Sequence, residues 1–184
     1  MKLSWSQKLF LKINRSVGRH PQFDRIMYFC GQWLIFILAG GALLALFLDF
    51  LKTGSWYLIL LSGIAFICTL SLSYLTALIF PHPRPVRELA NVKQLLHPIE
   101  SWKSFPSDHT IAVTLFTIII WAVSDETRFD PWAVLFYMLA AVLVMCGRVY
   151  GGVHYPRDII GGIVFALGGI IFSVLICSRY FFFV

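Results

Sequence analysis

Residues 26–48 read IMYFCGQWLIFILAGGALLALFL and contain no charged side chain. A helix of about 20 predominantly apolar residues is long enough to cross the hydrocarbon core of a bilayer. A stretch of this length and composition therefore predicts a transmembrane helix.

The overall composition supports the same prediction. Of the 184 residues, 59% are hydrophobic and 13% are charged, whereas a soluble domain carries about 25% charged residues. One small core cannot hold so much apolar surface, so lipid must cover part of it. We predict an all-α integral membrane bundle with five transmembrane helices, whose further spans are about 56–80, 111–123, 131–146 and 158–177.

The N-terminal segment has a different pattern. Apolar and basic residues alternate there at helical spacing, which is typical of a helix that lies in the headgroup plane. We expect a single domain over residues 1–184, with an amphipathic interfacial helix in residues 1–22 and the transmembrane bundle with its active-site loops in 23–184. The two stripes are Leu9, Phe10, Ile13 and Val17 on one side, and Lys8, Lys12, Arg15 and Arg19 on the other.

The formal net charge of +6 indicates an anionic partner. Long apolar spans argue against nucleic acid, so membrane lipid headgroups or an anionic substrate are the expected partners. The four cysteines stand apart in apolar stretches and form no metal-ligand or disulfide pattern. We predict no metal and no cofactor, and the sequence carries no pattern that fixes an oligomeric state.

The polar residues that stand out gather on one side of the predicted membrane. The connections after the second and fourth spans lie on the same face, and a planar guanidinium can donate two parallel hydrogen bonds to phosphate oxygens. The start of the third span adds backbone N–H groups. This predicts an anion-binding site built from Arg84, Arg87, Ser107, Asp108, His109, Arg148, His154 and Asp158.

Two histidines in this set have complementary positions. His154 and Asp158 are four residues apart; they share a face if the helix begins by His154, and otherwise the loop must fold to bring them together. Such a pair lets the carboxylate accept from one ring nitrogen while the other attacks. His109 lies on another segment and can act as a general acid. Taken singly, each residue has a simpler interpretation: Arg84 or Arg148 as an interfacial anchor, His154 as a structural histidine, and Ser107 as a helix cap.

The order of these residues resembles a known family. Arg84-Pro85, then Pro106-Ser107-Asp108-His109, then the run from Gly147 to Asp158 (GRVYGGVHYPRD) resemble the three-part signature of the type-2 phosphatidic acid phosphatase superfamily. Asp108 in the second motif, the five spans and the N-terminus are most similar to its bacitracin-resistance branch, the undecaprenyl pyrophosphate phosphatases.

The resemblance implies a role for each residue. His154 attacks phosphorus and forms a phosphohistidine, Asp158 orients it, and His109 protonates the leaving phosphate. The phosphoryl group is bound by Arg84, Ser107 and Arg148, with Asp108 in the same motif, and no metal is needed. One departure is Ala77, where the family usually has a lysine; Arg87, Lys103 and His82 are the candidates to replace its charge.

We therefore predict hydrolysis of undecaprenyl pyrophosphate to the monophosphate, which recycles the carrier for cell-wall synthesis. The alternatives are a phosphatase of phosphatidic acid or phosphatidylglycerophosphate, a lipid phosphotransferase, or, in another class, an anion transporter or a non-catalytic lipid-binding protein. The resemblance implies a bacterial cytoplasmic membrane with the site on its extracytoplasmic face. The positive-inside rule alone would place this Lys- and Arg-rich face in the cytoplasm.

Overall fold

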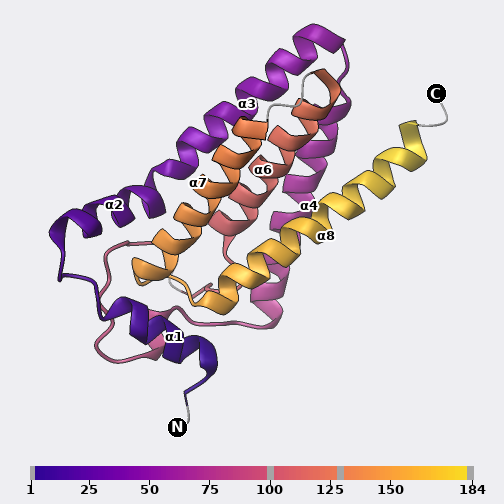
Figure 1. Cartoon of the computed structure of the whole chain (residues 1–184). Helices are drawn as coiled ribbons and strands as arrows, with labels where there is room; N and C mark the ends of the chain where they lie inside the picture. The colour runs from indigo at the N-terminus through magenta and orange to yellow at the C-terminus, as the bar shows by residue number, and fades with distance from the viewer. Residues whose placement is uncertain (1–2, 99–101, 128–130, 182–184) are drawn as a thin grey trace.

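The structure, a computed structural model, describes residues 3–98, 102–127 and 131–181 and is helical, with no strand in these ranges (Figure 1). The predicted all-α class is confirmed. The helices are α1 (Trp5–Asn14), α2 (Pro21–Gln32), α3 (Leu34–Thr53), α4 (Tyr57–Ile79), α5 (Pro85–Glu88), α6 (Asp108–Thr127), α7 (Pro131–Tyr150) and α8 (Pro156–Phe181).

Four stretches of helix are long and apolar enough to cross a membrane. They are 21–53, which joins α2 and α3, then α4, α7 and the part of α8 up to residue 179. The predicted third span corresponds to α6, whose apolar part covers 108–124. This helix packs against α3, α4, α7 and α8 and so occupies the centre of the bundle (Figure 1).

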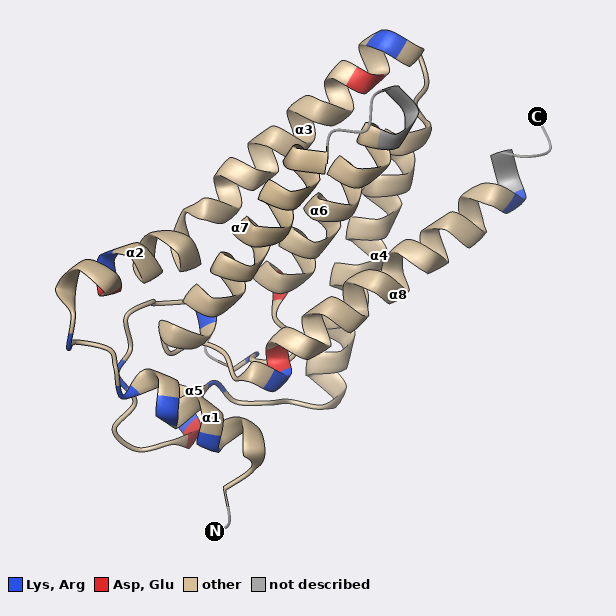
Figure 2. Cartoon of the chain, in the orientation of Figure 1, with Lys and Arg blue, Asp and Glu red and all other residues tan. Residues whose placement is uncertain are grey.

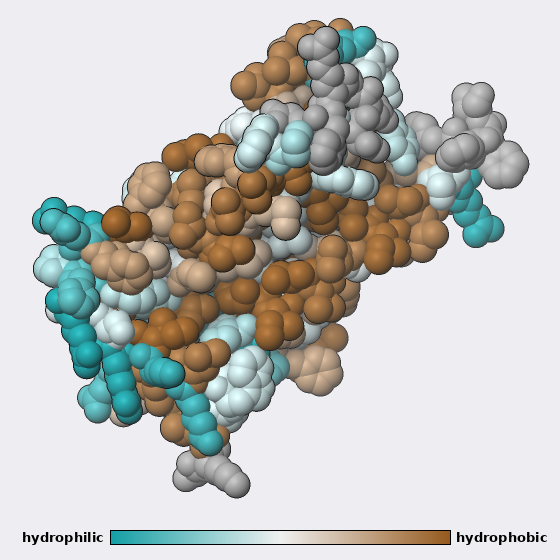
Figure 3. Space-filling model, in the orientation of Figure 1, coloured by the Kyte–Doolittle hydropathy of each residue, from teal (hydrophilic) through white to brown (hydrophobic). Residues whose placement is uncertain are grey.

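Large apolar side chains cover the outside of the bundle (Figure 3). Leu43 on α3 and Ile67 and Leu78 on α4 are about two-thirds exposed, which water would oppose and lipid tolerates. The core includes Leu38 and Ala42 of α3 together with Val113 of α6. The exposed apolar belt is the surface expected of a multi-pass membrane protein.

The first predicted span differs in shape from a single straight helix. It divides at Trp33, the residue between α2 and α3. The α2 part packs closely on α7, because the backbones of Gly31 and Gly147 approach so closely that a Cβ on Gly147 would meet the Gly31 nitrogen at 2.6 Å. The predicted fourth span is also longer than expected, since α7 continues past Cys146 to Tyr150.

Helix α1 begins with a capping box, in which Ser4 Oγ accepts from the Gln7 N–H and the Gln7 side chain accepts from the Ser4 N–H. The predicted apolar stripe is divided between two environments. Phe10 and Val17 are buried, whereas Leu9 is 42% exposed. The polar side chain of Asn14 is buried and donates to the Lys93 carbonyl at 2.7 Å, so α1 docks on the protein by polar as well as apolar contacts.

Charged side chains gather at the end of the bundle where α1 lies (Figure 2). The N-terminal ends of α6 and α8 and the C-terminal end of α7 all lie at this end (Figure 1). The fold therefore brings together the three segments that carry the conspicuous polar residues.

Candidate active site

The imidazole of His154 lies in the connection between α7 and α8 and is 3% exposed. Its Nδ1 lies 2.9 Å from the carbonyl oxygen of Ser104, an acceptor, so Nδ1 carries the proton. Its Nε2 lies 3.2 Å from Nη1 of Arg84. The guanidinium can only donate, so Nε2 presents a lone pair, as a nucleophile requires.

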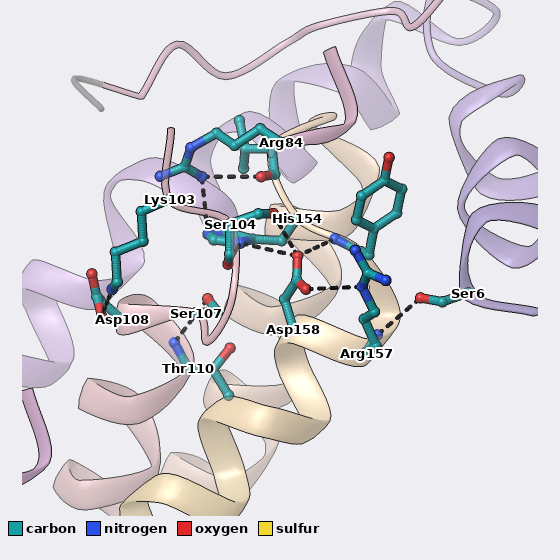
Figure 4. Close-up of polar contacts among 12 residues, drawn as sticks. Ser6, Arg84, Lys103, Ser104, Ser107, Asp108, Thr110, His154, Arg157 and Asp158 are labelled. Atoms are coloured by element: carbon teal, nitrogen blue, oxygen red, sulfur yellow. Dashed lines mark hydrogen bonds and ion pairs between the residues drawn. The ribbon is translucent and has the colours of Figure 1, made fainter. Parts of the chain in front are cut away.

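Asp158 supports this ring indirectly. Its Oδ2 accepts from Ser104 Oγ at 2.6 Å and from the Tyr155 N–H at 2.8 Å, while its distance to His154 Nδ1 is 3.6 Å. That distance is too long for a hydrogen bond. The spacing of His154 and Asp158 predicts a direct hydrogen bond from the ring to the carboxylate. In the structure the Ser104 carbonyl accepts from the ring, and the Ser104 hydroxyl donates to the carboxylate (Figure 4).

The surroundings of His154 favour the neutral ring. Burial, together with the positive charges of Arg148 and Arg84, lowers the pKa of His154 to about 4, while Asp158 acts in the opposite direction. A ring with a pKa this far below neutrality keeps its lone pair at physiological pH. The site therefore holds a neutral imidazole whose Nε2 lone pair is available without a separate base.

Two buried arginines approach the ring from different elements. Arg84 precedes α5, whose first residue is Pro85, and its Nη1 donates to the Val153 carbonyl at 3.0 Å. Arg148 lies near the end of α7, and its Nη1 donates to the Gly31 carbonyl at 3.1 Å. The Nε of Arg148 is buried with no hydrogen-bond partner among the described residues, and this donor is suited to an anionic ligand.

A cavity of about 330 Å³ opens between these groups. Its walls combine cationic, titratable and aromatic side chains, namely Gln32, Phe36, Tyr74, Arg84, His97, Pro98, Asp108, His109, Arg148 and His154. A larger groove of about 530 Å³, on the outer surface between α1, α2, α7 and α8, is lined almost wholly by apolar side chains. The smaller cavity is the one whose chemistry suits a phosphate group.

Comparison with known proteins identifies the family. The model of the PAP2 superfamily matches residues 54–182, which include all three motif segments. The chain belongs to the PAP2 superfamily. The resemblance inferred from the motifs is thereby confirmed.

The PAP2 relatives extend over most of the chain. Undecaprenyl-diphosphatase BcrC of Bacillus subtilis is 32% identical over 160 residues, covering 87% of this chain and 78% of its own. The bacitracin transport permease protein BcrC of Bacillus licheniformis is 28% identical over 168 residues, covering 91% and 76%. The crystal structure of Aquifex aeolicus LpxE superimposes with a TM-score of 0.63 at 27% identity, covering 94% of this chain and 96% of that one.

Some residues of the PAP2 motifs lie outside the cavity wall. Ser107 is fully buried, and its Oγ accepts from the Thr110 N–H at 3.4 Å as a cap of α6. Arg87 is exposed on α5. Lys103 is buried behind the wall against Asp108, and Ala77 is fully buried. Ser107, Arg87 and Lys103 thus do not line the cavity in this structure.

Sequence analysis did not identify Ser104, Tyr74 or Gln32 as site residues. Ser104 acts through its backbone carbonyl as well as its hydroxyl, and a carbonyl has no signature in the sequence. Tyr74 and Gln32 belong to apolar spans, where a single aromatic or amide residue is typical of packing. Only the proximity of Ser104 to the Pro106-Ser107-Asp108-His109 motif could have drawn attention to it.

Proposed function

We propose that the protein hydrolyses undecaprenyl diphosphate to undecaprenyl phosphate and inorganic phosphate through a phosphohistidine at His154. One observation carries the proposal: the ring hydrogen-bonds through Nδ1 to the Ser104 carbonyl, so Nε2 remains the attacking atom in a cavity that Arg84 and Arg148 also line. The names of the PAP2 relatives support the choice of a lipid diphosphate.

The reaction follows from the positions of the two histidines. His154 Nε2 forms a bond to the terminal phosphorus, and the bond from that phosphorus to the bridging oxygen breaks. His109, on the first turn of α6 and in the same cavity, gives a proton to the leaving undecaprenyl phosphate. Water then attacks the phosphohistidine, His109 takes its proton, and inorganic phosphate leaves as the P–N bond breaks.

The arginines supply the electrostatic stabilisation. Charge develops on the oxygens of the transferring phosphoryl group, and guanidinium groups fixed by backbone carbonyls need no reorganisation as this happens. Arg84 and Arg148 each donate one such bond to a carbonyl. We also assign Ser107 to the residues that stabilise the phosphoryl group. It acts by capping α6, whose N-terminal N–H groups favour an anion.

The polyprenyl tail leaves the cavity sideways into the bilayer in this proposal. Phe36 on α3 and Tyr74 on α4 line the cavity and are also exposed on the outer surface, by 62% and 39%. An apolar tail can follow this route without meeting water. The site is assigned to the extracytoplasmic face of a bacterial cytoplasmic membrane, in keeping with the family resemblance.

The test is phosphate release in detergent from undecaprenyl diphosphate, phosphatidic acid and phosphatidylglycerophosphate. We expect the diphosphate to be preferred and His154→Ala to lower kcat by at least about 10³-fold, as for the loss of a nucleophile. His20→Ala is the matched control, since His20 is exposed and its side chain caps nothing.

The same assay addresses the alternatives. Preference for either monophosphate would move the substrate to that lipid, and phosphate transfer to an added lipid alcohol would identify a phosphotransferase. Equal release by wild type and His154→Ala would contradict the enzymatic assignment. That result would favour transport, the activity named for the relative from Bacillus licheniformis.

A further inference from the structure

Lys103 is one of the largest fully buried side chains of the protein, with an exposed fraction of 2%. Its Nζ contacts Oδ1 of Asp108 (Figure 4). It also lies 4.4 Å from the centre of the Tyr74 ring. Ser73 Oγ donates to the same carboxylate oxygen at 2.9 Å. The loop before α6 and helix α4 therefore both hold Asp108 Oδ1.

The position of Asp108 is unfavourable for an anion site on charge alone. It lines the cavity together with Arg84, Arg148 and His154, and its side chain is about one-third exposed. An ionised carboxylate only accepts hydrogen bonds and repels a phosphate dianion. Because the cavity is partly shielded from water, this repulsion is stronger than it would be in solution.

Lys103 removes that repulsion in the present arrangement. A buried ammonium beside the carboxylate makes the pair neutral, so the positive charge of Arg84 and Arg148 remains available to the ligand. The ammonium itself does not line the cavity. In this respect Lys103 differs from the two arginines, which do line it. Burying a lysine is costly unless it is paired, so the pairing with Asp108 also keeps the amine in place.

We propose that Lys103 is a positioning residue that acts through Asp108, cancelling its charge and fixing its carboxylate so that the terminal phosphate of the substrate can enter between the arginines. This inference rests on the proposed function. It differs from a direct phosphate contact, because the effect of Lys103 then depends on Asp108 being present.

Because Lys103 acts through Asp108, the two single variants should change the affinity for phosphate in opposite directions. Lys103→Met leaves an unneutralised carboxylate in the cavity, so KM rises and inorganic phosphate inhibits less strongly, each by about tenfold, the effect of 1.4 kcal/mol. Asp108→Asn removes the negative charge from the cavity wall, so inorganic phosphate inhibits more strongly than in wild type. The double variant Lys103→Met/Asp108→Asn removes both charges and recovers at least about threefold of the affinity that Lys103→Met loses.

The experiment measures KM, kcat and product inhibition by inorganic phosphate for wild type and these variants in detergent. Lys93→Met is the matched control, because that lysine donates to the Val17 carbonyl outside the cavity, and its KM should match wild type. A merely structural role would lower kcat in Lys103→Met and in the double variant alike.

Two outcomes would overturn the inference. A double variant as weak as Lys103→Met would show that Lys103 binds phosphate directly or only supports folding, and unchanged phosphate inhibition in Asp108→Asn would show that the carboxylate does not act on the ligand. Failure of the proposed function is distinct, since wild type itself would then release no phosphate from lipid diphosphate. Size-exclusion profiles of wild type and the four variants show which variants are folded.

Discussion

At the scale of single residues, the chemistry depends on the protonation state of His154. Burial holds its pKa at about 4, below its ordinary value of 6.5. The neutral, nucleophilic ring is the form present above the pKa, so it persists through mildly acidic conditions and is lost as the pH falls through about 4. At pH 5.5 the ring should still be almost wholly neutral, where an ordinary histidine would be mostly protonated.

We therefore predict that protonation of His154 does not lower kcat/KM around pH 6.5. The substrate phosphate also titrates near neutrality, so the ring is best followed directly, by NMR of protein labelled with ¹⁵N-histidine. The resonance that disappears in His154→Ala should titrate near pH 4. A midpoint near 6.5 for this resonance would contradict the burial seen in the structure.

The motifs predict several of the side chains that meet in the cavity, but not how these side chains are connected. Arg84, Arg148 and His109 were expected from the motifs, and all three line the cavity beside His154. Residue spacing suggested a direct bond from His154 to Asp158, because four residues span one helical turn. In the structure α8 begins only at Pro156, so His154 lies outside the helix and the loop places Ser104 between them.

At the scale of helices, α1 connects to the segment that carries His154. Gln7 Nε2 and the Tyr155 hydroxyl both donate to the carboxylate of Glu88, each at 2.8 Å. Burial and this acceptor raise the pKa of Tyr155 above its ordinary value, so the hydroxyl stays protonated and continues to donate. Tyr155 also packs edge-on against Phe10. One carboxylate thus joins α1, α5 and the residue next to His154.

We predict that Glu88→Ala lowers both stability and turnover. Losing an acceptor shared by two donors should cost about 1–2 kcal/mol and lower the Tm in detergent, and kcat should fall because the His154 segment loses support. Arg87→Ala is the control on the same helix. Its side chain is exposed, so unchanged turnover there would also remove Arg87 from the auxiliary phosphate-binding candidates.

The contact of α2 with α7 gives a second prediction at this scale. A Cβ on Gly147 would meet the Gly31 nitrogen at 2.6 Å and the Met27 carbonyl at 2.9 Å, and backbone atoms cannot move aside as a side chain can. Gly147→Ala should separate the helices, lengthen the bond from Arg148 to the Gly31 carbonyl, and cost about 1–3 kcal/mol.

The matched control is Gly40→Ala on α3, where an added Cβ has no atom within 4 Å. Alanine is the better helix former by up to about 1 kcal/mol, so this variant should be neutral or slightly stabilised. The Tm reports the change in stability, and the KM for lipid diphosphate reports the displacement of Arg148. Equal behaviour of both alanine variants would show that the α2–α7 contact is looser than described.

Composition predicts the residue ranges of the helices better than it predicts their shapes. Apolar runs located the spans, because length and hydropathy are local properties of the chain. The division at Trp33, the central place of α6 and the burial of polar side chains on α1 depend on contacts between distant segments. Asn14 illustrates this, since its partner Lys93 is 79 residues away.

At the scale of the whole molecule, the uneven charge raises the question of which side of the membrane holds the site. The end with α1 and the cavity carries most of the Lys and Arg residues (Figure 2). The positive-inside rule would place that end in the cytoplasm, whereas the family resemblance implies that it lies outside. Arg84 and Arg148 are buried in the site, and Lys93 donates to the Val17 carbonyl, so part of the charge has a structural or functional role independent of topology.

Cysteine labelling distinguishes the two orientations. In a variant with alanine at all four native cysteines, Gln22→Cys reports the α1 end and Ser55→Cys the opposite end; both sites are exposed and uncharged, so the charge balance is kept. We predict that a membrane-impermeant maleimide labels Gln22→Cys in intact cells and Ser55→Cys only after permeabilisation. The reverse pattern would place the cavity in the cytoplasm, where the substrate would have to be a lipid phosphate of the inner leaflet, while the helical bundle and the roles of His154 and the two arginines would stand.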